Sequence, residues 1–270
     1  MEETNRVHYF HADASSLGGA LDHPVHKIVP SQAAVSLPST GGFTSKRSGS
    51  FNFDEIVSCG GTFTHASGGR SLKNGAFTTL VTSAVDKLNI LEIVTADRVV
   101  GQISIEHPRE GHDPKVTFVG SQFINLRIGG VPVEPVINLG LLTPEEGYPG
   151  CPWIRHEGFL QRVREQHRLR HEGKKVPAWA VDRYAWIESP KGIEERGHVV
   201  CSIVDSLKGE IPGKSFGHVV EIEEFGKFFF GEVIVSHGAF QLTMVRAELG
   251  CAVHGSIGVA SARGNGNTIP

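Results

Sequence analysis

Short runs of alternating apolar and polar residues dominate the first half of the chain. In Ser50–Asp54 the two phenylalanines share one side and the polar residues share the other, and Arg98–Glu106 alternates in the same way. A period of two residues is typical of a β-strand with one buried face. Strand-like composition predicts further strands at Val7–His11, Ala33–Pro38, Glu55–His65, Ala76–Val85, Asn89–Thr95, Lys115–Val119, Gln122–Ile128 and Val133–Leu139.

The middle of the chain changes to a helical period. Within His156–His171, Phe159, Leu160 and Val163 recur at the spacing of one helix face. Gly173 follows as a natural end for such a helix. The sequence therefore predicts a helical insertion near residues 150–180.

The final third returns to strand patterns. Strands are predicted at His198–Val204, Phe216–Ile222, Lys227–Val235, Phe240–Leu249 and Ala252–Ala260, followed by a polar, extended tail. Short strands separated by turn signals every 8–12 residues indicate an antiparallel sheet protein. The predicted fold class is mainly β, an antiparallel β-sandwich or distorted barrel with one helical insertion near 150–180. Residues 1–270 are expected to form a single β-rich domain.

Composition supports this reading and excludes several classes of protein. The 270 residues include 33 glycines and 14 prolines, which suits a fold with many turns. A net charge of −3 gives no basic signal for nucleic acid, and no apolar stretch is long enough to predict a membrane span. The first residues lack a basic segment followed by an apolar one. We therefore expect a cytoplasmic protein, with export by a non-Sec route as the alternative.

The cysteines and common motifs predict no cofactor. Cys59, Cys151, Cys201 and Cys251 stand far apart without a C-x-x-C pair, so a cysteine zinc site is not expected. Buried free thiols are the favoured interpretation, and two disulfides are the alternative. The chain contains neither H-E-x-x-H nor G-x-G-x-x-G, the patterns of zinc peptidases and dinucleotide sites.

Histidines supply the first candidate chemistry. His11 and Asp13 share one face of the first predicted strand, and His23 and His26 follow shortly after, with His8 just before. Imidazole and carboxylate groups together suit divalent metals. Scattered exposed histidines are the alternative interpretation.

Two further sets of residues are candidates for binding and catalysis. The polar loop Glu106–Asp113 joins two strands, and its side chains Glu106, His107, Arg109 and His112 are candidates for ligand binding. Asp97, Arg127, His218 and Glu232 stand in otherwise apolar strands. They are candidate catalytic residues only if they share a cavity. For Asp97 and Arg127, an internal ion pair is the favoured interpretation.

Part of the chain resembles a known bacterial family. The segments Thr-Ala-Asp-Arg-Val at 95–99 and Gly-Ser-Gln-Phe-Ile-Asn-Leu-Arg-Ile-Gly-Gly-Val-Pro-Val at 120–133 are similar to the core of the choice-of-anchor class P type of cell-surface protein. The similarity covers about Ser58 to Leu139. It implies a β fold and an extracytoplasmic setting, and it implies no activity. The predicted helical insertion departs from the pattern of that family.

Two functional hypotheses follow. The first is a non-enzymatic β-rich protein that acts by self-assembly, as a homo-oligomer or with an assembly partner, or by binding a partner or ligand. The second is a β-barrel isomerase, cyclase or hydrolase that acts on a small hydrophobic substrate through His, Asp and Glu side chains. The two differ in whether the candidate catalytic residues converge on one cavity.

Overall fold

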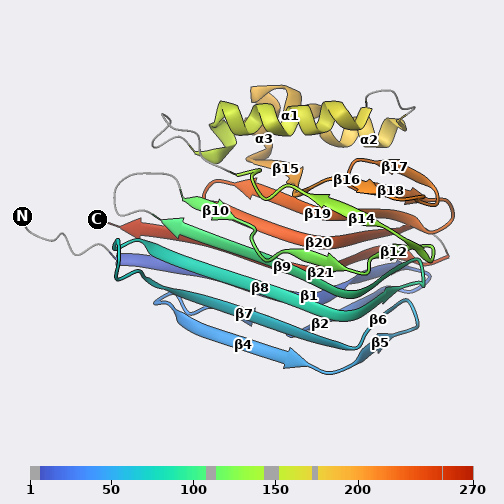
Figure 1. Cartoon of the computed structure of the whole chain (residues 1–270), viewed down its shortest axis with the longest axis horizontal. Coiled ribbons are helices and arrows are strands. Elements are labelled where there is room, and N and C mark those ends of the chain that lie inside the picture. The colour runs from blue at the N-terminus through green and yellow to red at the C-terminus, as the bar shows by residue number, and fades with distance from the viewer. Residues whose placement is uncertain (1–6, 108–113, 143–151, 172–175, 251, 270) are drawn as a thin grey trace, which may run out of the picture.

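The computed structural model describes residues 7–107, 114–142, 152–171, 176–250 and 252–269. Its strands form two large antiparallel sheets that pack face to face, with a two-stranded sheet and a helical layer beside them (Figure 1). The predicted fold class is confirmed as a mainly β sandwich, and the described strands do not close into a barrel.

Sheet A contains strands from both ends of the chain. Its main path runs β17-β18-β19-β20-β21-β1-β2, with β15 paired to β19 and β3 paired to β1. The strands are β1 (Val7–His23), β2 (Lys27–Gln32), β3 (Val35–Ser36), β15 (His198–Ser202), β17 (Lys214–Phe216), β18 (Val219–Ile222), β19 (Gly226–Ser236), β20 (Ala239–Gly250) and β21 (His254–Ile269). The polar tail predicted to be extended is part of β21, which pairs with β1 along nearly its full length.

Sheet B is built from the segment between these two groups. Its path runs β13-β12-β9-β8-β6-β5, with β7 joining β8 to β4 and with β10 and β11 paired to β9. The strands are β4 (Gly42–Ser48), β5 (Phe51–Phe53), β6 (Val57–Cys59), β7 (Gly61–Arg70), β8 (Phe77–Ile90), β9 (Val94–His107), β10 (Lys115–Thr117), β11 (Gln122–Ile124), β12 (Arg127–Ile128) and β13 (Val131–Pro132). A separate ribbon pairs β14 (Glu134–Ile137) with β16 (Val204–Lys208).

The strand predicted over Asn89–Thr95 is wrong. The chain turns there from β8 into β9, with Leu91 at φ 51° and Glu92 at φ 58°. Asn89 accepts a hydrogen bond from the backbone N–H of Glu92 through its side-chain oxygen, at 2.7 Å. This side chain stabilises a tight turn that carries no glycine, the residue that normally marks such a conformation.

The core lies between the two sheets. Phe230 of β19 is fully buried and contacts Phe123 of β11, with ring centroids 6.1 Å apart. The sheets approach closely where Gly101 of β9 crosses β21, since a Cβ atom at Gly101 would lie 2.6 Å from the carbonyl oxygen of Ala260. A glycine at this position therefore permits the packing distance.

The helical layer is longer than predicted. It contains η1 (Trp153–Arg155), α1 (Glu157–His171), α2 (Ala178–Tyr184), η2 (Ala185–Glu188) and α3 (Pro190–Arg196). The predicted helix matches α1 closely, but the layer extends to residue 196 instead of 180. Ser189 caps α3 by accepting a hydrogen bond from the N–H of Gly192, and Gly197 ends the helix at φ 67°. The seven residues of α3 are too few to show a clear helical period. Its capping residues are therefore the main sign of this helix in the sequence.

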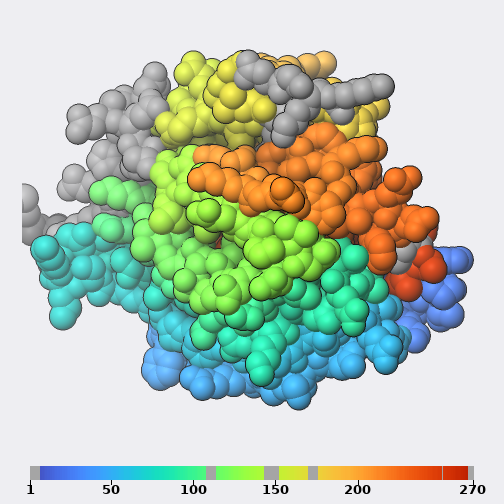
Figure 2. Space-filling model, turned by 45° about the vertical axis from the view of Figure 1, so that its right-hand side comes forward, coloured from blue at the N-terminus to red at the C-terminus, as the bar shows by residue number. Residues whose placement is uncertain are grey.

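The helices cover the outer face of sheet A at the β15–β19 side. Phe230 faces sheet B, whereas its neighbour Phe229 contacts Trp179 of α2 on the opposite side. In the space-filling view, the orange residues of the final third lie directly beneath the yellow helices (Figure 2). Among the residues that the structure describes, no helix combines the length and apolar character needed to cross a bilayer.

Candidate functional site

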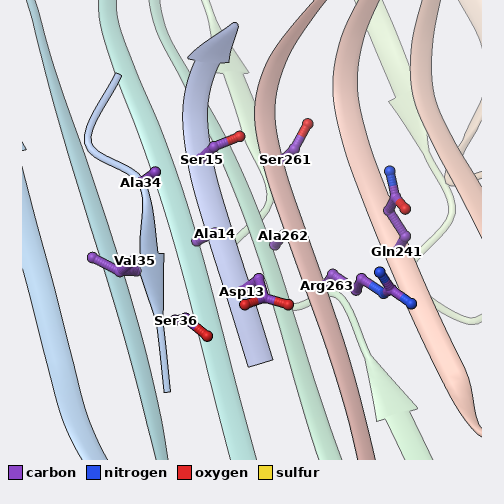
Figure 3. A pocket seen from close by; sticks show the side chains of 10 residues that line it. All are labelled: Asp13, Ala14, Ser15, Ala34, Val35, Ser36, Gln241, Ser261, Ala262 and Arg263. Carbon is purple, nitrogen blue, oxygen red and sulfur yellow. The ribbon is translucent and has the colours of Figure 1, made fainter. Parts of the chain in front are cut away.

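A groove lies on the outer face of sheet A, away from the helices. Its volume is about 500 Å³, and Figure 3 shows the ten side chains that line it: Asp13, Ala14, Ser15, Ala34, Val35, Ser36, Gln241, Ser261, Ala262 and Arg263. On β1, Phe10, Ala12 and Ala14 are buried while Tyr9, His11 and Asp13 are exposed. The alternation of a strand therefore places the polar side chains on the outer face.

Strand register brings polar residues from distant parts of the chain into two rows. Asp13 is directly opposite Arg263, and Arg263 is directly opposite Gln241. Figure 3 shows Asp13 beside Arg263, with Gln241 beyond it. A second row places Ser15 opposite Ser261. Directly opposite residues in antiparallel strands lie about 5 Å apart, so each row presents its groups to one bound molecule.

The groups in this groove are available to a ligand. Across the described part of the chain, no side-chain hydrogen bond or ion pair engages the carboxylate of Asp13, the guanidinium of Arg263 or the amide of Gln241. The hydroxyl of Ser261 is 3.2 Å from that of Thr243. The groove thus combines a fixed cation, an anion, an amide and hydroxyls, which can both donate and accept hydrogen bonds.

The same face continues beyond the groove along β1. His11 and Tyr9 follow Asp13 at two-residue steps, and Tyr9 is 42% exposed. Asn265 of β21 is directly opposite His11. A ligand longer than the groove therefore meets an aromatic ring on this side.

The predicted metal site does not form. His11 and His23 belong to the same strand, β1, and lie twelve residues apart along it, a separation of about 40 Å. His23 contacts His254, and His26 is 3.5 Å from Asp22 in an exposed pair. Only Asp13 of the four candidates lines the groove. Among the described residues no group of three or more potential ligands could hold a metal ion.

The four predicted catalytic residues do not share a cavity. Asp97 and Arg127 lie on sheet B, where Asn125 donates to Asp97 at 2.6 Å and Arg127 donates to the carbonyl of Gly130. His218 and Glu232 are buried on the side of sheet A that the helices cover. The condition attached to their catalytic role is therefore not met. The interpretation of Asp97 and Arg127 as internal ion pairs is also wrong, since both are exposed.

Sequence reasoning missed a charged cluster beneath α2. Both carboxylate oxygens of Glu232 accept hydrogen bonds from Arg246, at 2.6 and 2.8 Å. Arg246 also binds Glu248, to which Arg183 of α2 donates at 3.1 Å. Both guanidinium groups lie over the ring of Phe229, at 4.0 and 4.5 Å. These contacts connect α2 to sheet A.

A glycine explains why alternation did not predict this cluster. Phe229 and Glu232 are three residues apart, yet both contact Arg246 and Arg183 on the helix side. Gly231 lies between them at φ 64° and interrupts the two-residue period of β19. The sequence period alone places Glu232 on the wrong face.

The cluster predicts a loss of stability at acid pH. Burial raises the pKa of Glu248, but the hydrogen bond and charge of Arg246, with those of Arg183, outweigh it and hold that pKa below its usual value. A carboxyl with a lowered native pKa stabilises the fold above its unfolded pKa, and this stabilisation is lost as the pH falls through the native pKa. We expect the free energy of unfolding, measured with urea, to fall between pH 5 and 3, and we expect Glu248→Gln to reduce this fall. Glu223→Gln, at an exposed position, should leave the dependence of this free energy on pH as in wild type. An equal dependence in all three proteins would contradict the role of Glu248.

The predicted binding loop is described only at its start. Glu106 accepts a hydrogen bond from Asn74 at 3.1 Å, and His107 packs against His8, with ring centroids 4.7 Å apart. Burial, followed by the nearby His8, lowers the pKa of His107 to about 4. Arg109 and His112 lie outside the described residues.

The cysteines and one serine motif add no catalytic group. Cys59 and Cys201 are buried, and the thiol of Cys201 donates a hydrogen bond to the carbonyl of Val233 at 3.7 Å. Cys151 and Cys251 lie outside the described residues. Gly213–Gly217 matches the pattern G-x-S-x-G, but Ser215 lies in β17 opposite Val220 of β18. A nucleophile elbow requires a turn from a strand into a helix, so this serine does not occupy one.

Comparison with known proteins gives a family and no function. No curated protein and no solved structure matches the chain. Residues 8–236 match a family described as "Domain of unknown function (DUF8256)", and this stretch includes β1 and most of both sheets. The match covers well over half of the 270 residues, so the chain belongs to the DUF8256 family.

Proposed function

We propose that this protein is a non-enzymatic binding protein whose groove on sheet A takes a polar, hydroxyl-rich small molecule, with a saccharide as the ligand class. The observation that carries this proposal is the row Asp13, Arg263 and Gln241, which the register of three strands aligns along an outward-facing groove. A rigid sheet holds these side chains without a loop rearrangement.

The chemistry of the groove favours hydroxyl groups over a simple anion or an apolar ligand. Arg263 would attract an anion, but Asp13 directly opposite it would repel one. A sugar hydroxyl can accept from the guanidinium and donate to the carboxylate at the same time. The serines and Gln241 add further partners of both kinds.

Size and neighbouring surface are consistent with one or a few sugar units. The groove, at about 500 Å³, lies within the 300–1,000 Å³ typical of ligand sites. Tyr9, on the same face of β1, offers an exposed ring on which the apolar face of a further sugar unit can pack.

The other functional hypotheses have weaker support. Glu232 was a candidate acid-base residue, but Arg246 occupies both of its carboxylate oxygens. His218 is buried beside Tyr184 under the helices, and it is not among the residues that line the groove. Self-assembly stays a prediction, because no observation on the described residues supports it as the groove supports ligand binding.

Saccharide binding by the wild-type protein and by Arg263→Ala tests the proposal. An immobilised panel of mono- and oligosaccharides identifies the ligand, and titration calorimetry measures its affinity. We expect Arg263→Ala to weaken binding at least about tenfold, because a hydrogen bond to a charged group contributes about 1.5–3 kcal/mol. Arg98→Ala, which removes an exposed arginine from sheet B, is the matched control and should bind as wild type does.

Two results would overturn the proposal. The first is the absence of binding to every saccharide of the panel. The second is binding that Arg263→Ala and Asp13→Ala leave unchanged, which would place the ligand elsewhere on the molecule.

A further inference from the structure

The polar side chains of the groove continue along the strands, toward the start of β1. After the row of Asp13 and Arg263 comes His11, which is exposed and directly opposite the half-exposed Asn265 of β21. The next outward side chain of β1 is Tyr9, which is 42% exposed. Side chains on one face of a strand repeat every two residues, so these groups follow the groove in one line.

The helical layer covers the other direction, across the strands. Ile234 of β19 is directly opposite Gln241, and Val200 of β15 is directly opposite Ile234. Both side chains are apolar and partly buried, and Nε2 of His167 in α1 lies 3.3 Å from the carbonyl oxygen of Val200. On the opposite side the row ends at Ser36, because β3 pairs with β1 alone among the described strands. A ligand longer than the groove therefore extends along the strands.

The line of polar groups has two ends. Past Ser15, the next two side chains of β1 are buried, and the pair Gly18 and Gly258 that follows has no side chains. At the other end Val7 follows Tyr9 and is exposed, but its side chain forms no hydrogen bonds. From Ser15 to Tyr9 the strand advances six residues, a distance of about 20 Å. This length exceeds a single sugar ring and matches a chain of several.

The groups beyond the groove differ in what they offer a sugar. The side-chain oxygen of Asn265 accepts a hydrogen bond from the N–H of Gly266 at 2.6 Å, and its NH₂ group can donate to a ligand. His11 can donate or accept through its ring nitrogens. The ring of Tyr9 provides a flat apolar surface instead. Hydrogen-bonding groups thus lead from the groove to an aromatic ring.

The shape of this surface favours an extended chain. β1 and β21 pair without a register shift from Val7 to Leu21, so the support beneath the line is continuous. A β-1,4-linked chain of glucose or N-acetylglucosamine is extended, whereas an α-1,4-linked chain of glucose curves. The ring substituents of both sugars are equatorial, which leaves an apolar ring face that can pack on Tyr9.

We propose that the ligand is an extended, β-1,4-linked oligosaccharide of glucose or N-acetylglucosamine that lies along β1 and β21. One unit occupies the groove between Asp13 and Arg263, and a later unit packs on the ring of Tyr9. This inference rests on the proposed function, because it adds the length and the linkage of the saccharide to the site already described.

Titration calorimetry with cello-, chito- and malto-oligosaccharides tests length and linkage separately. The cello and malto series contain the same glucose units and differ in linkage alone. We expect the affinity for one of the two β-1,4-linked series to rise at least about tenfold from disaccharide to pentasaccharide, since each added unit brings hydrogen bonds or ring packing. The malto pentasaccharide should bind at least about tenfold more weakly than the better β-1,4-linked one.

Substitution of Tyr9 tests the far end of the site. Tyr9→Ala should weaken binding of the pentasaccharide at least about fivefold and leave the disaccharide unaffected, because only the longer chain reaches the ring. Tyr9→Phe keeps the ring and should bind the pentasaccharide as wild type does. Phe43→Ala, which removes an exposed ring from β4 of sheet B, is the matched control. Circular dichroism verifies the fold of each variant.

Four outcomes would overturn this inference. They are no binding of either β-1,4-linked series, a pentasaccharide bound no more tightly than the disaccharide, equal affinity for the cello and malto pentasaccharides, and Tyr9→Ala without effect on the pentasaccharide. In each case, binding of another or a shorter saccharide that depends on Arg263 would leave the proposed function standing. The absence of binding to every saccharide would overturn both.

Discussion

Arg246→Met is expected to lower the free energy of unfolding by about 3–5 kcal/mol, the cost typical of breaking a buried ion pair from one side. Arg246 provides both hydrogen bonds to Glu232, whose side chain is only 6% exposed. After the substitution the nearest cation is Arg183, 3.7 Å away, which is too far to replace both bonds. The carboxylate would then stay buried without adequate solvation.

Urea unfolding of single and double variants measures this effect. Adding Glu232→Met to Arg246→Met should restore much of the lost stability, because the buried charge disappears together with its partner. Arg98→Met is the control, since Arg98 is exposed and 3.6 Å from Asp86, and it should change stability by less than about 1 kcal/mol. A loss of similar size in Arg98→Met and Arg246→Met would contradict a special role for the cluster.

Phe230→Ala is expected to destabilise the protein by about 3–5 kcal/mol, the range for truncating a large aromatic side chain in a core. Phe230 is fully buried in sheet A and contacts Phe123 of sheet B. Truncation removes buried apolar surface and leaves a cavity between the two sheets. A loss of stability this large is expected only if the two sheets share one core.

Phe43→Ala is the matched control for this prediction. Phe43 lies on β4 and is 77% exposed, so its truncation should change the free energy of unfolding by no more than about 0.5 kcal/mol. Equilibrium denaturation of both variants gives the comparison. Similar losses for the two phenylalanines, or a loss below about 1 kcal/mol for Phe230→Ala, would argue against the packing of the sandwich.

The sequence predicted the class of fold because most strands alternate cleanly. Alternation in Arg98–Glu106 marks the centre of β9, and the helical period marks α1 to within one residue of its start. Prediction failed where a local conformation overrides the pattern. Leu91 and Glu92 turn the chain inside an apolar run, and Gly231 shifts the faces of β19.

The candidate groove could not be predicted because its residues are ordinary and far apart in the chain. Asp13 lies near one end of the sequence, and Gln241 and Arg263 lie near the other. Only the pairing of β1, β20 and β21 brings them together. The alternation along β1 predicts that its polar residues share one face. A single sequence does not show which strands pair with β1.

The pattern of histidines predicts the wrong neighbours for His8. His8 belonged to the predicted N-terminal cluster, whereas its neighbour in the fold is His107, from the predicted binding loop. The length of β1 carries His23 away from His11, while the sandwich brings the ends of β1 and β9 together. Long strands separate residues that are close in sequence, and strand packing joins residues that are distant.

The most direct test of the central claim is an amide chemical-shift titration of the wild-type protein with the best saccharide from the binding panel. Binding in the groove is expected to give the largest shifts at residues 13–15, 34–36, 241 and 261–263, with smaller shifts near Tyr9. Shifts confined to the helical layer or to sheet B, or spread without a maximum over the surface, would contradict the groove as the ligand site.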